Sequence, residues 1–543
     1  MPGWSIHSRR PRGQSRGLAI GRDPDILGSF LEDAAHFPGG HASGLVVAAS
    51  ETDIAGALRI SRAVLPIGAQ SSLTGGATPM GDVLVSTSRL NHILAVGADS
   101  VRVEAGVALA ELLAALEEAG RYYPSAPTFT GAFVGGTVAT NAAGAATFKY
   151  GTTRDWVLAL TVVLPGGDVL DIERGATRAH PDGYFDIVLP DRVARVPVPR
   201  YRMPRLAKLA AGYFADPEMD LIDLFIGSEG TLGVITEVTL RVLPRRPAMC
   251  LALVPFADSG AAFAFVRQLR DTTRDTWRTA DARGIDVSAI EHMDARCLAL
   301  LREDGVDRAS SVVAGPATTL ALLVTIELPP GTRTDQAYDD IGRAGEKDAP
   351  DTPLGRFCRS LDAAGVLDDV EIAVPGDRAR AERLLAIREA VPNAVNQRVG
   401  RAKRTIDERI EKTAADMIVP FDRLDEFLAF CDAEFRRRGL DWAVWGHISD
   451  GNLHPNVIPR SMADVESGKA AILVLGREAI RLGGSPLAEH GVGRNAVKQR
   501  LLEELYGRAG VDDMRRVKRA IDPEWKLAPG VVFGKEFIPH SEL

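Results

Sequence analysis

Two histidines on either side of a tight turn are the strongest chemical signal in this sequence. Residues 446–454 read Gly-His-Ile-Ser-Asp-Gly-Asn-Leu-His, so His447 and His454 flank the turn at residues 450–452. If the flanking segments are paired strands, both imidazoles can point into one pocket. Neutral imidazole is a good ligand for zinc and similar ions. Histidine pairs of this kind also occur without a metal, and that alternative stays open.

A carboxylate and a third imidazole follow downstream. Residues 488–493 read Ala-Glu-His-Gly-Val-Gly and supply Glu489 and His490. Two histidines and one carboxylate leave coordination positions open, which is typical of a catalytic metal site rather than a structural one. A histidine can also accept the proton of an alcohol near neutral pH.

Three segments of small residues indicate a second kind of site. Residues 66–77 combine glycines and hydroxyls just after an apolar strand, so their backbone N–H groups can converge on a pyrophosphate. Residues 135–144 lack bulky side chains, and residues 226–236 repeat the pattern. A flat ligand against the backbone explains these choices, and tightly packed turns are the alternative. The first segment is neither a GxGxxG motif nor a P-loop.

The elements that position these residues follow from periodicity and turn signals. In the first half we expect short strands at 83–87 and 101–105 and a helix at 109–119. An apolar strand at 156–164 should turn into a hairpin at 165–170. An insertion or long loop should follow at 174–220, before strand character returns at 222–242. In the second half we expect an α+β sheet with helices on one side. Its strands are 251–254 and 322–326, and its helices 259–269 and 422–438.

The chain of 543 residues is too long for one core, so at least two domains are expected. We predict four parts with the main boundary near residue 246. They are an N-terminal extension at 1–40, a first domain at 41–245 with the insertion near 174–220, a second domain at 246–500, and a C-terminal segment at 501–543 that returns to the first domain.

Composition excludes several classes of protein. A net charge of −8 argues against a general nucleic-acid binder. The four cysteines lie far apart, which favours reduced thiols in a reducing, cytoplasmic compartment, with peripheral attachment to a membrane as an alternative. No apolar run reaches the ~18–20 residues of a membrane span. The arginine-rich start, residues 1–21, is read as a disordered basic tail, with a transit peptide as the alternative.

Together, the three small-residue segments resemble the FAD-binding domain of the vanillyl-alcohol oxidase and p-cresol methylhydroxylase superfamily. Their order and spacing are similar to the branch with D-lactate dehydrogenase, D-2-hydroxyglutarate dehydrogenase and the glycolate oxidase flavin subunit. The resemblance runs from about residue 40 to residue 533. It implies an α+β fold with a two-part FAD-binding domain of the p-cresol methylhydroxylase type and a C-terminal α+β substrate and cap domain. Because residues 66–77 contain no histidine, the FAD should be non-covalent.

The resemblance assigns the FAD contacts to small residues of the three segments and to their immediate neighbours. These are Pro66, Gly68, Ala69, Gln70, Ser71, Ser72, Gly75, Gly76, Pro127, Thr128, Gly135, Gly136, Thr137, Asn141, Ala142, Gly144, Tyr150, Gly151, Glu229, Gly230, Gly233 and Ile235.

The same branch has GHxxDGNxH and EHGxG patterns, and both occur here without a gap. The resemblance therefore implies that His447, His454 and Glu489 bind a divalent metal such as zinc. It implies that His490 is the catalytic base and that Asn452 lies beside the substrate. Residues 385–390 resemble the family's short helical motif with the substrate-binding arginine, which makes Arg388 the candidate carboxylate clamp. A solvated helix arginine stays open as the alternative.

The sequence departs from its relatives at three places. The D-2-hydroxyglutarate enzymes carry a lysine two residues before the aspartate of a DxxxP motif, but here that position is Ala414, and Lys412 is displaced by two. The charged segment 393–413 is longer than in close relatives, and we expect it to shape specificity or cover the site. The closing motif at residues 522–530 has Ala528 where the family has asparagine.

The predicted function is that of an FAD-dependent dehydrogenase, which oxidises a lactate-like D-2-hydroxy acid to the 2-oxo acid by hydride transfer to the flavin. Its electrons would pass to a quinone, a cytochrome, an electron-transfer flavoprotein or oxygen, and a homodimer is an open option. Two alternatives remain. One is a non-redox transferase of the alkylglycerone-phosphate synthase type, and the other is an electron-transfer flavin subunit of a larger complex.

Overall fold

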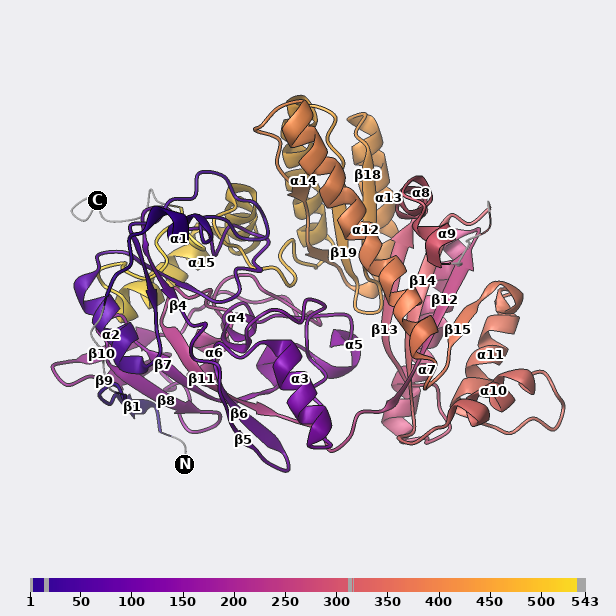
Figure 1. Cartoon of the computed structure of the whole chain (residues 1–543), viewed down its shortest axis with the longest axis horizontal. Helices are drawn as coiled ribbons and strands as arrows, with labels where there is room; N and C mark the ends of the chain where they lie inside the picture. Colours follow the sequence, from indigo (N-terminus) through magenta and orange to yellow (C-terminus); the bar gives the residue numbers. More distant parts are fainter. Residues whose placement is uncertain (1–2, 14–18, 311–314, 316, 535–543) are drawn as a thin grey trace. The chain divides into compact units, whose positions relative to one another are not determined.

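The computed structural model describes residues 3–13, 19–310, 315 and 317–534. The chain divides into two compact units, whose elements are labelled in Figure 1. The first unit holds Met1–Gly144, Gly151–Pro244 and Ser485–Leu543, and the second unit holds Ala145–Tyr150 and Arg245–Gly484. The main division thus falls beside residue 246. The chain returns to the first unit at Ser485 instead of residue 501, and the short segment 145–150 belongs to the second unit.

Three sheets form the first unit, each with its strands given in spatial order. The parallel sheet contains β2 (Gly44–Val47), β4 (Val83–Ser86) and β3 (Val64–Ile67). The antiparallel sheet contains β5 (Ile93–Val96), β6 (Ser100–Glu104), β11 (Val234–Arg241), β7 (Val157–Val163) and β8 (Val169–Glu173). The third sheet contains β1 (Ser5–His7), β9 (Tyr184–Val188) and β10 (Val193–Pro197). The expected strands at 83–87, 101–105 and 156–164 and the hairpin after them are confirmed.

The helices of the first unit are α1 (Pro24–Gly28), α2 (Glu51–Ile60), α3 (Leu109–Glu118), α4 (Val134–Ala139), η1 (Thr153–Asp155), α6 (Ile222–Phe225) and α15 (Ala496–Ile521). The serine before α2 caps it, because the Ser50 hydroxyl accepts the Asp53 N–H at 3.2 Å. Its apolar face contributes Ile54 and Leu58 to one core with strand residues of the parallel and antiparallel sheets. Full burial of such an aliphatic side chain stabilises the fold by about 1.5–3 kcal/mol.

Three expectations for the first unit are corrected by the structure. Residues 184–197 form the β9–β10 hairpin instead of a long loop, because alternate residues such as Phe185 and Ile187 are buried. The arginine-rich start is ordered over residues 3–13, and β1 pairs in parallel with β9. Arg9 fixes this arm, since its guanidinium pairs with Glu51 at 2.6 Å and with Asp171. Residues 222–225 are also helical, and the strand of that region begins only at Val234.

An eight-stranded sheet forms the second unit, with β15-β12-β14-β13-β18-β19-β16 in order and β17 paired to β19. Its strands are β12 (Ala248–Phe256), β13 (Val287–Asp294), β14 (Leu320–Leu328), β15 (Glu371–Ala373), β16 (Thr413–Ala414), β17 (Met417–Ile418), β18 (Trp442–His447) and β19 (Asn452–Val457). Its helices are α5 (Thr147–Tyr150), α7 (Ser259–Thr279), α8 (Ala295–Glu303), α9 (Val306–Ser310), α10 (Thr334–Gly342), α11 (Pro353–Ala363), η2 (Leu367–Asp369), α12 (Arg378–Thr405), η3 (Phe421–Arg423), α13 (Leu424–Arg437) and α14 (Met462–Arg481).

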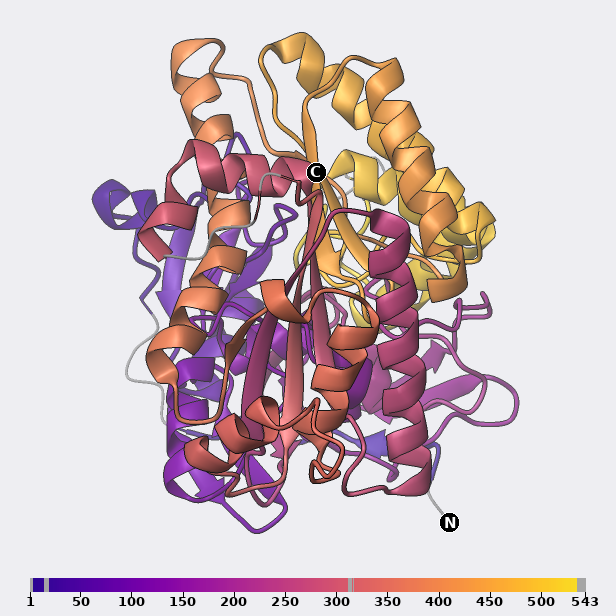
Figure 2. The ribbon, with the colours of Figure 1, turned by 90° about the vertical axis from the view of Figure 1, so that its right-hand side faces the viewer.

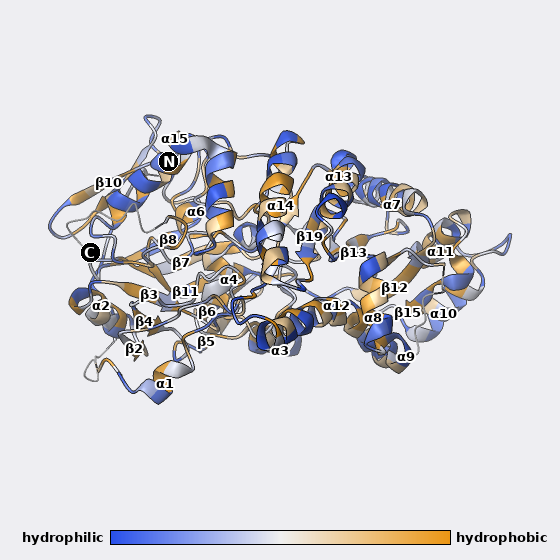
Figure 3. Ribbon diagram, turned by 90° about the horizontal axis from the view of Figure 1, so that it is seen from above, coloured by the Kyte–Doolittle hydropathy of each residue, from blue (hydrophilic) through white to orange (hydrophobic). Residues whose placement is uncertain are grey.

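Helices cover both faces of this sheet, so the expectation of helices on one side is wrong. Leu253 of β12 shares a core with Ile387 of α12. Phe256 points to the opposite face of the same strand and contacts Phe265 of α7, with ring centroids 5.6 Å apart. Figure 2 shows the strands between the magenta α7 and the orange α12. Strand β12 is hydrophobic along its length, as Figure 3 shows, because both of its faces are covered.

Candidate active site

The histidine motif lies on the antiparallel hairpin of β18 and β19, as the sequence predicts. The register pairs Trp445 with His454, so His447 and His454 point to the same face of the sheet as diagonal neighbours. Their ring centroids are 5.6 Å apart and the ring planes meet at 89°. Both side chains are buried.

The turn between the two histidines depends on a glycine. Gly451 has a φ of +87°, and a Cβ there would lie 2.2 Å from the carbonyl oxygen of Val419. Neighbouring elements hold the turn from outside. Arg270 of α7 donates to the Ser449 carbonyl, and the Ser449 hydroxyl accepts the Ile290 N–H at 3.2 Å. These contacts fix the conformation of the turn between the two histidines.

Glu291 of β13 lies directly opposite His447 in the register. Its Oε1 is 3.0 Å from His447 Nδ1, and its Oε2 is 3.1 Å from a guanidinium nitrogen of Arg388 on α12. Burial raises the pKa of the Glu291 carboxyl, but the charges of Arg388 and His447 outweigh burial and hold it at about 2. Because the ionised carboxylate can only accept, Nδ1 of His447 is the donor in this contact, which leaves Nε2 as the ring nitrogen that can face a ligand.

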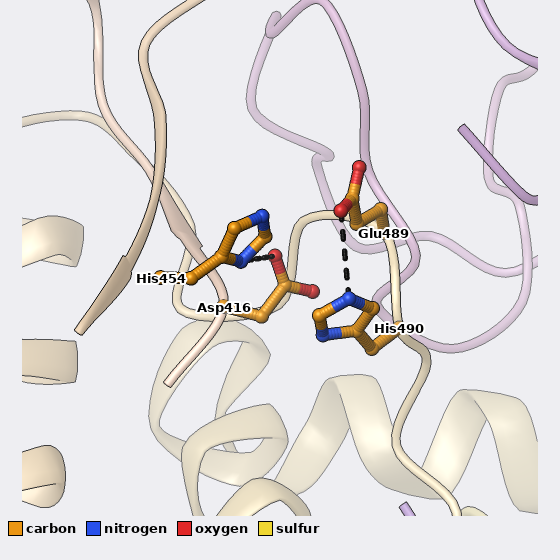
Figure 4. Close-up of side chains that lie close together, drawn as sticks. All are labelled: Asp416, His454, Glu489 and His490. Atoms are coloured by element: carbon orange, nitrogen blue, oxygen red, sulfur yellow. Dashed lines mark ion pairs between the residues drawn. The ribbon is translucent and has the colours of Figure 1, made fainter. Parts of the chain in front are cut away.

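Asp416 lies beside the second histidine in a looser arrangement. Its Oδ1 is 3.5 Å from His454 Nδ1, an ion pair drawn as a dashed line in Figure 4. Asn452 holds that carboxylate, because its Nδ2 donates to Asp416 Oδ1 at 3.0 Å and to the Met417 carbonyl at 3.0 Å. The Oδ1 atom of Asn452 is buried and has no hydrogen-bond partner among the residues that the structure describes.

Glu489 and His490 lie in the first unit. The Nε2 atom of His490 is 3.4 Å from Glu489 Oε1, the second ion pair of Figure 4. The other carboxylate oxygen of Glu489 accepts the ammonium of Lys208 at 3.0 Å, and the Lys208 side chain is fully buried. Lys208 lies in the stretch expected to be an insertion, and no pattern in the sequence marks it.

The first small-residue segment follows β3 and forms an open loop. Across residues 3–13, 19–310, 315 and 317–534, no acceptor pairs with the backbone N–H groups of Ala69, Gln70, Ser71 and Ser72. Four consecutive amides in an accessible loop suit the oxygens of a pyrophosphate. The Gln70 side chain has a structural task, because its Nε2 donates to the Phe30 and Ala77 carbonyls at 2.9 and 2.8 Å.

The second and third segments pack against each other and against the first. The Glu229 N–H donates to the Ala139 carbonyl at 2.7 Å, and a Cβ on Gly230 would lie 3.5 Å from Pro66. Gly135 packs on β6, whereas Gly136 faces open space where a side chain would meet nothing within 4 Å. The three segments therefore meet in the first unit and leave one glycine surface accessible.

The segment after His490 is fixed to these loops. The half-buried Glu229 carboxylate accepts the N–H groups of Val492 and Gly493, both at 2.8 Å. Gly493 has a φ of +59°, and a Cβ there would lie 2.2 Å from the Thr74 hydroxyl. Arg494 donates to the Thr78 carbonyl at 3.0 Å. The Glu489–His490 pair is therefore anchored to the small-residue loops of the first unit.

Two of the expected FAD-binding side chains are engaged elsewhere. Asn141 accepts the Arg154 N–H at 3.0 Å and donates to the Leu209 carbonyl at 3.4 Å, so it braces its own loop. Tyr150 belongs to the second unit, where its hydroxyl donates to Glu327 at 2.6 Å.

The site has residues that reasoning from the sequence did not find. Glu291 is the one acid within the apolar run of 287–293, and such a buried acid is a signal for a partner. Asp416 is the aspartate of the DxxxP motif, and nothing else in the sequence indicates a role for it. The arrangement offers two imidazole nitrogens backed by carboxylates, a carboxylate–histidine pair, and an anion-binding loop. These groups suit cation binding, proton transfer and dinucleotide binding.

Comparison with known proteins identifies the family. Residues 42–173 match the family described as "FAD binding domain", and residues 248–532, more than half of the chain, match "FAD linked oxidases, C-terminal domain". The chain belongs to the FAD-linked oxidase family, with a domain of the p-cresol methylhydroxylase type. It is an FAD-dependent oxidoreductase with the α+β, two-part fold that the sequence predicts.

Individual relatives lie at moderate identity. A D-lactate dehydrogenase of Anaerostipes hadrus is 28% identical over 90% of this chain and 89% of its own. A D-2-hydroxyglutarate dehydrogenase of Xanthomonas citri pv. viticola is 29% identical over 87% and 84%. A solved alkyldihydroxyacetonephosphate synthase has a TM-score of 0.58 at 14% identity, over 96% of this chain and 87% of its own, and shares the fold. None of the helices that the structure describes is long and apolar enough to cross a membrane.

Proposed function

We propose that this protein oxidises a lactate-like D-2-hydroxy acid to the 2-oxo acid, with non-covalent FAD and a divalent metal ion. The observation that carries the proposal is the pair of imidazoles on one face of the sheet, each with Nδ1 turned to a carboxylate. Such backing is typical of metal-binding histidines. The relatives named as D-lactate and D-2-hydroxyglutarate dehydrogenases support the substrate class.

His447 and His454, through Nε2, and Glu489 would hold the metal. Bound FAD would supply the hydride acceptor, and a bound divalent ion would supply positive charge that polarises the substrate hydroxyl. The four amides of residues 69–72 would bind the FAD pyrophosphate.

His490 would accept the hydroxyl proton. Its side chain is 27% exposed, so it can pass the proton on to solvent. Arg388 would bind the substrate carboxylate, because a guanidinium has five N–H donors and its pairing with Glu291 leaves donors for a second carboxylate. Asn452 Oδ1 is a buried acceptor that can receive a hydrogen bond from the substrate.

Anaerobic bleaching of the flavin tests the proposal. A D-2-hydroxy acid such as D-lactate should bleach the flavin absorbance band at roughly 450 nm. The L-enantiomer should leave this band unchanged. Quinone, cytochrome, electron-transfer flavoprotein and oxygen can then be compared as acceptors that restore the colour. Failure of a panel of D-2-hydroxy acids to bleach the flavin would leave a non-redox or electron-transfer role as the better explanation.

Chelation tests the metal separately. Removal of the metal should abolish turnover and leave FAD bound, because His447, His454 and Glu489 are separate from the amides of residues 69–72 that would bind the pyrophosphate. Turnover should return when zinc is added back. Fully active enzyme that contains no metal by elemental analysis would refute this part of the proposal.

A further inference from the structure

Two side-chain relays of the same design flank the histidine hairpin. On one side, Arg388 contacts Glu291 at 3.1 Å, and Glu291 contacts His447 Nδ1 at 3.0 Å. On the other side, Asn452 donates to Asp416 at 3.0 Å, and Asp416 lies 3.5 Å from His454 Nδ1. The relays lie wholly within the second unit.

Strand register creates this symmetry. β13 pairs with β18 and places Glu291 opposite His447. On the far side, β19 pairs with β16 and β17, and the register on both sides of Asp416 brings it opposite His454. Each histidine therefore has a carboxylate as its cross-strand neighbour on the same face.

Burial of these charged carboxylates destabilises the fold unless neighbouring groups compensate their charge. Glu291 is 6% exposed and Asp416 is fully buried. An uncompensated buried carboxylate costs several kcal/mol, so a structure keeps it only with a cation or strong hydrogen-bond donors nearby. Arg388 pairs with Glu291, and Asn452 donates to Asp416. On the histidine side, Glu291 lies within hydrogen-bond distance of His447 Nδ1 at 3.0 Å, whereas Asp416 and His454 Nδ1 form an ion pair at 3.5 Å.

We propose that Glu291 and Asp416 are positioning residues that fix the tautomers and ring orientations of His447 and His454, with Arg388 and Asn452 as their anchors. This inference rests on the proposed function, since it assigns the two histidines to a metal. It also gives Arg388 and Asn452 a task besides any contact with substrate. Each relay selects Nε2 as the ligand atom and raises its basicity.

The test compares zinc affinity in variants of the full-length FAD-loaded protein. The protein is stripped of metal and titrated with Zn²⁺ against a chromophoric chelator. Glu291→Gln and Asp416→Asn should each weaken zinc binding roughly 10- to 100-fold, the usual effect of losing such a partner. The Co²⁺ form should show altered visible bands in both variants, and flavin absorbance should stay unchanged.

Glu434→Gln is the matched control. Glu434 is a buried carboxylate of α13 in the same unit, paired with Arg437 at 2.9 Å and Arg438 at 2.6 Å, and it contacts no histidine among the described residues. Its loss should leave zinc affinity within about threefold of the wild type, since an effect of general destabilisation would appear here as well.

The outcomes separate this inference from the proposed function. If wild-type protein binds no zinc, the metal part of the proposed function is wrong. If wild-type protein binds zinc and both relay variants bind it within threefold of wild type, the relays do not position the histidines, whereas the proposed function stands. If Glu434→Gln loses as much affinity as the relay variants, the effect is one of stability, and the inference is also wrong.

Discussion

Glu489 and His490 are neighbours in the sequence, and the proposed function gives them different tasks. His490→Ala should lower kcat roughly 10²–10⁴-fold, the usual contribution of a positioned base, with metal and flavin content almost unchanged. His447→Ala should instead lose the metal. The two variants are compared side by side by turnover, elemental analysis and flavin absorbance. If His490→Ala keeps near-normal turnover, or loses the metal as His447→Ala does, this division of tasks is wrong.

Asp294 predicts a pH dependence of stability in the second unit. Its carboxylate accepts the N–H groups of Cys297 and Val444, both at 2.8 Å, but burial outweighs them and raises its pKa from 3.8 to about 6. Because the pKa of Asp294 is higher in the folded than in the unfolded state, its contribution to stability is full below about pH 4. This contribution is lost as the pH rises through about 6. Compared with Asp294→Asn, wild-type protein should therefore lose up to about 2 kcal/mol of unfolding free energy between pH 4 and pH 6. Parallel denaturant titrations at both pH values check this.

At the scale of elements, the β18–β19 hairpin depends on its turn. Gly451→Ala should destabilise the second unit by about 2–4 kcal/mol, because a left-handed alanine is strained and its Cβ would meet the Val419 carbonyl. Gly439→Ala is the control, since Gly439 also has a positive φ of +65° but open space around a Cβ. It should cost about 1 kcal/mol.

Thermal melts of the two glycine variants measure the difference. Zinc affinity provides a second readout, because Gly451→Ala should also misplace the histidines. Equal melting temperatures for the two variants would show that the close approach at Gly451 does not fix the turn.

At the scale of the whole molecule, the FAD-binding loops predict a dissociable cofactor. Residues 66–77 offer backbone amides and hydroxyls but no histidine for a covalent bond. Purified protein should therefore be yellow, and acid or heat denaturation should release all FAD into the supernatant. Flavin that stays with the precipitated chain would contradict non-covalent binding.

The sequence alone determined the local features of this protein. The strands at 83–87 and 101–105, the helix at 109–119 and the histidine hairpin follow from periodicity and turn residues, which act between near neighbours in the chain. The motifs also determined the family, because small residues at fixed spacing reflect backbone contacts that side chains would block.

Only the tertiary structure decided which distant residues became partners. Glu291 meets His447, and Lys208 meets Glu489, across 156 and 281 residues of chain. Such pairs depend on the register between strands and on the place where an irregular segment packs. Neighbouring residues in the sequence do not indicate either of these. The same reason explains the errors. Helices on both sheet faces and an N-terminal strand paired with β9 are set by burial against remote elements, which periodicity within one segment does not record.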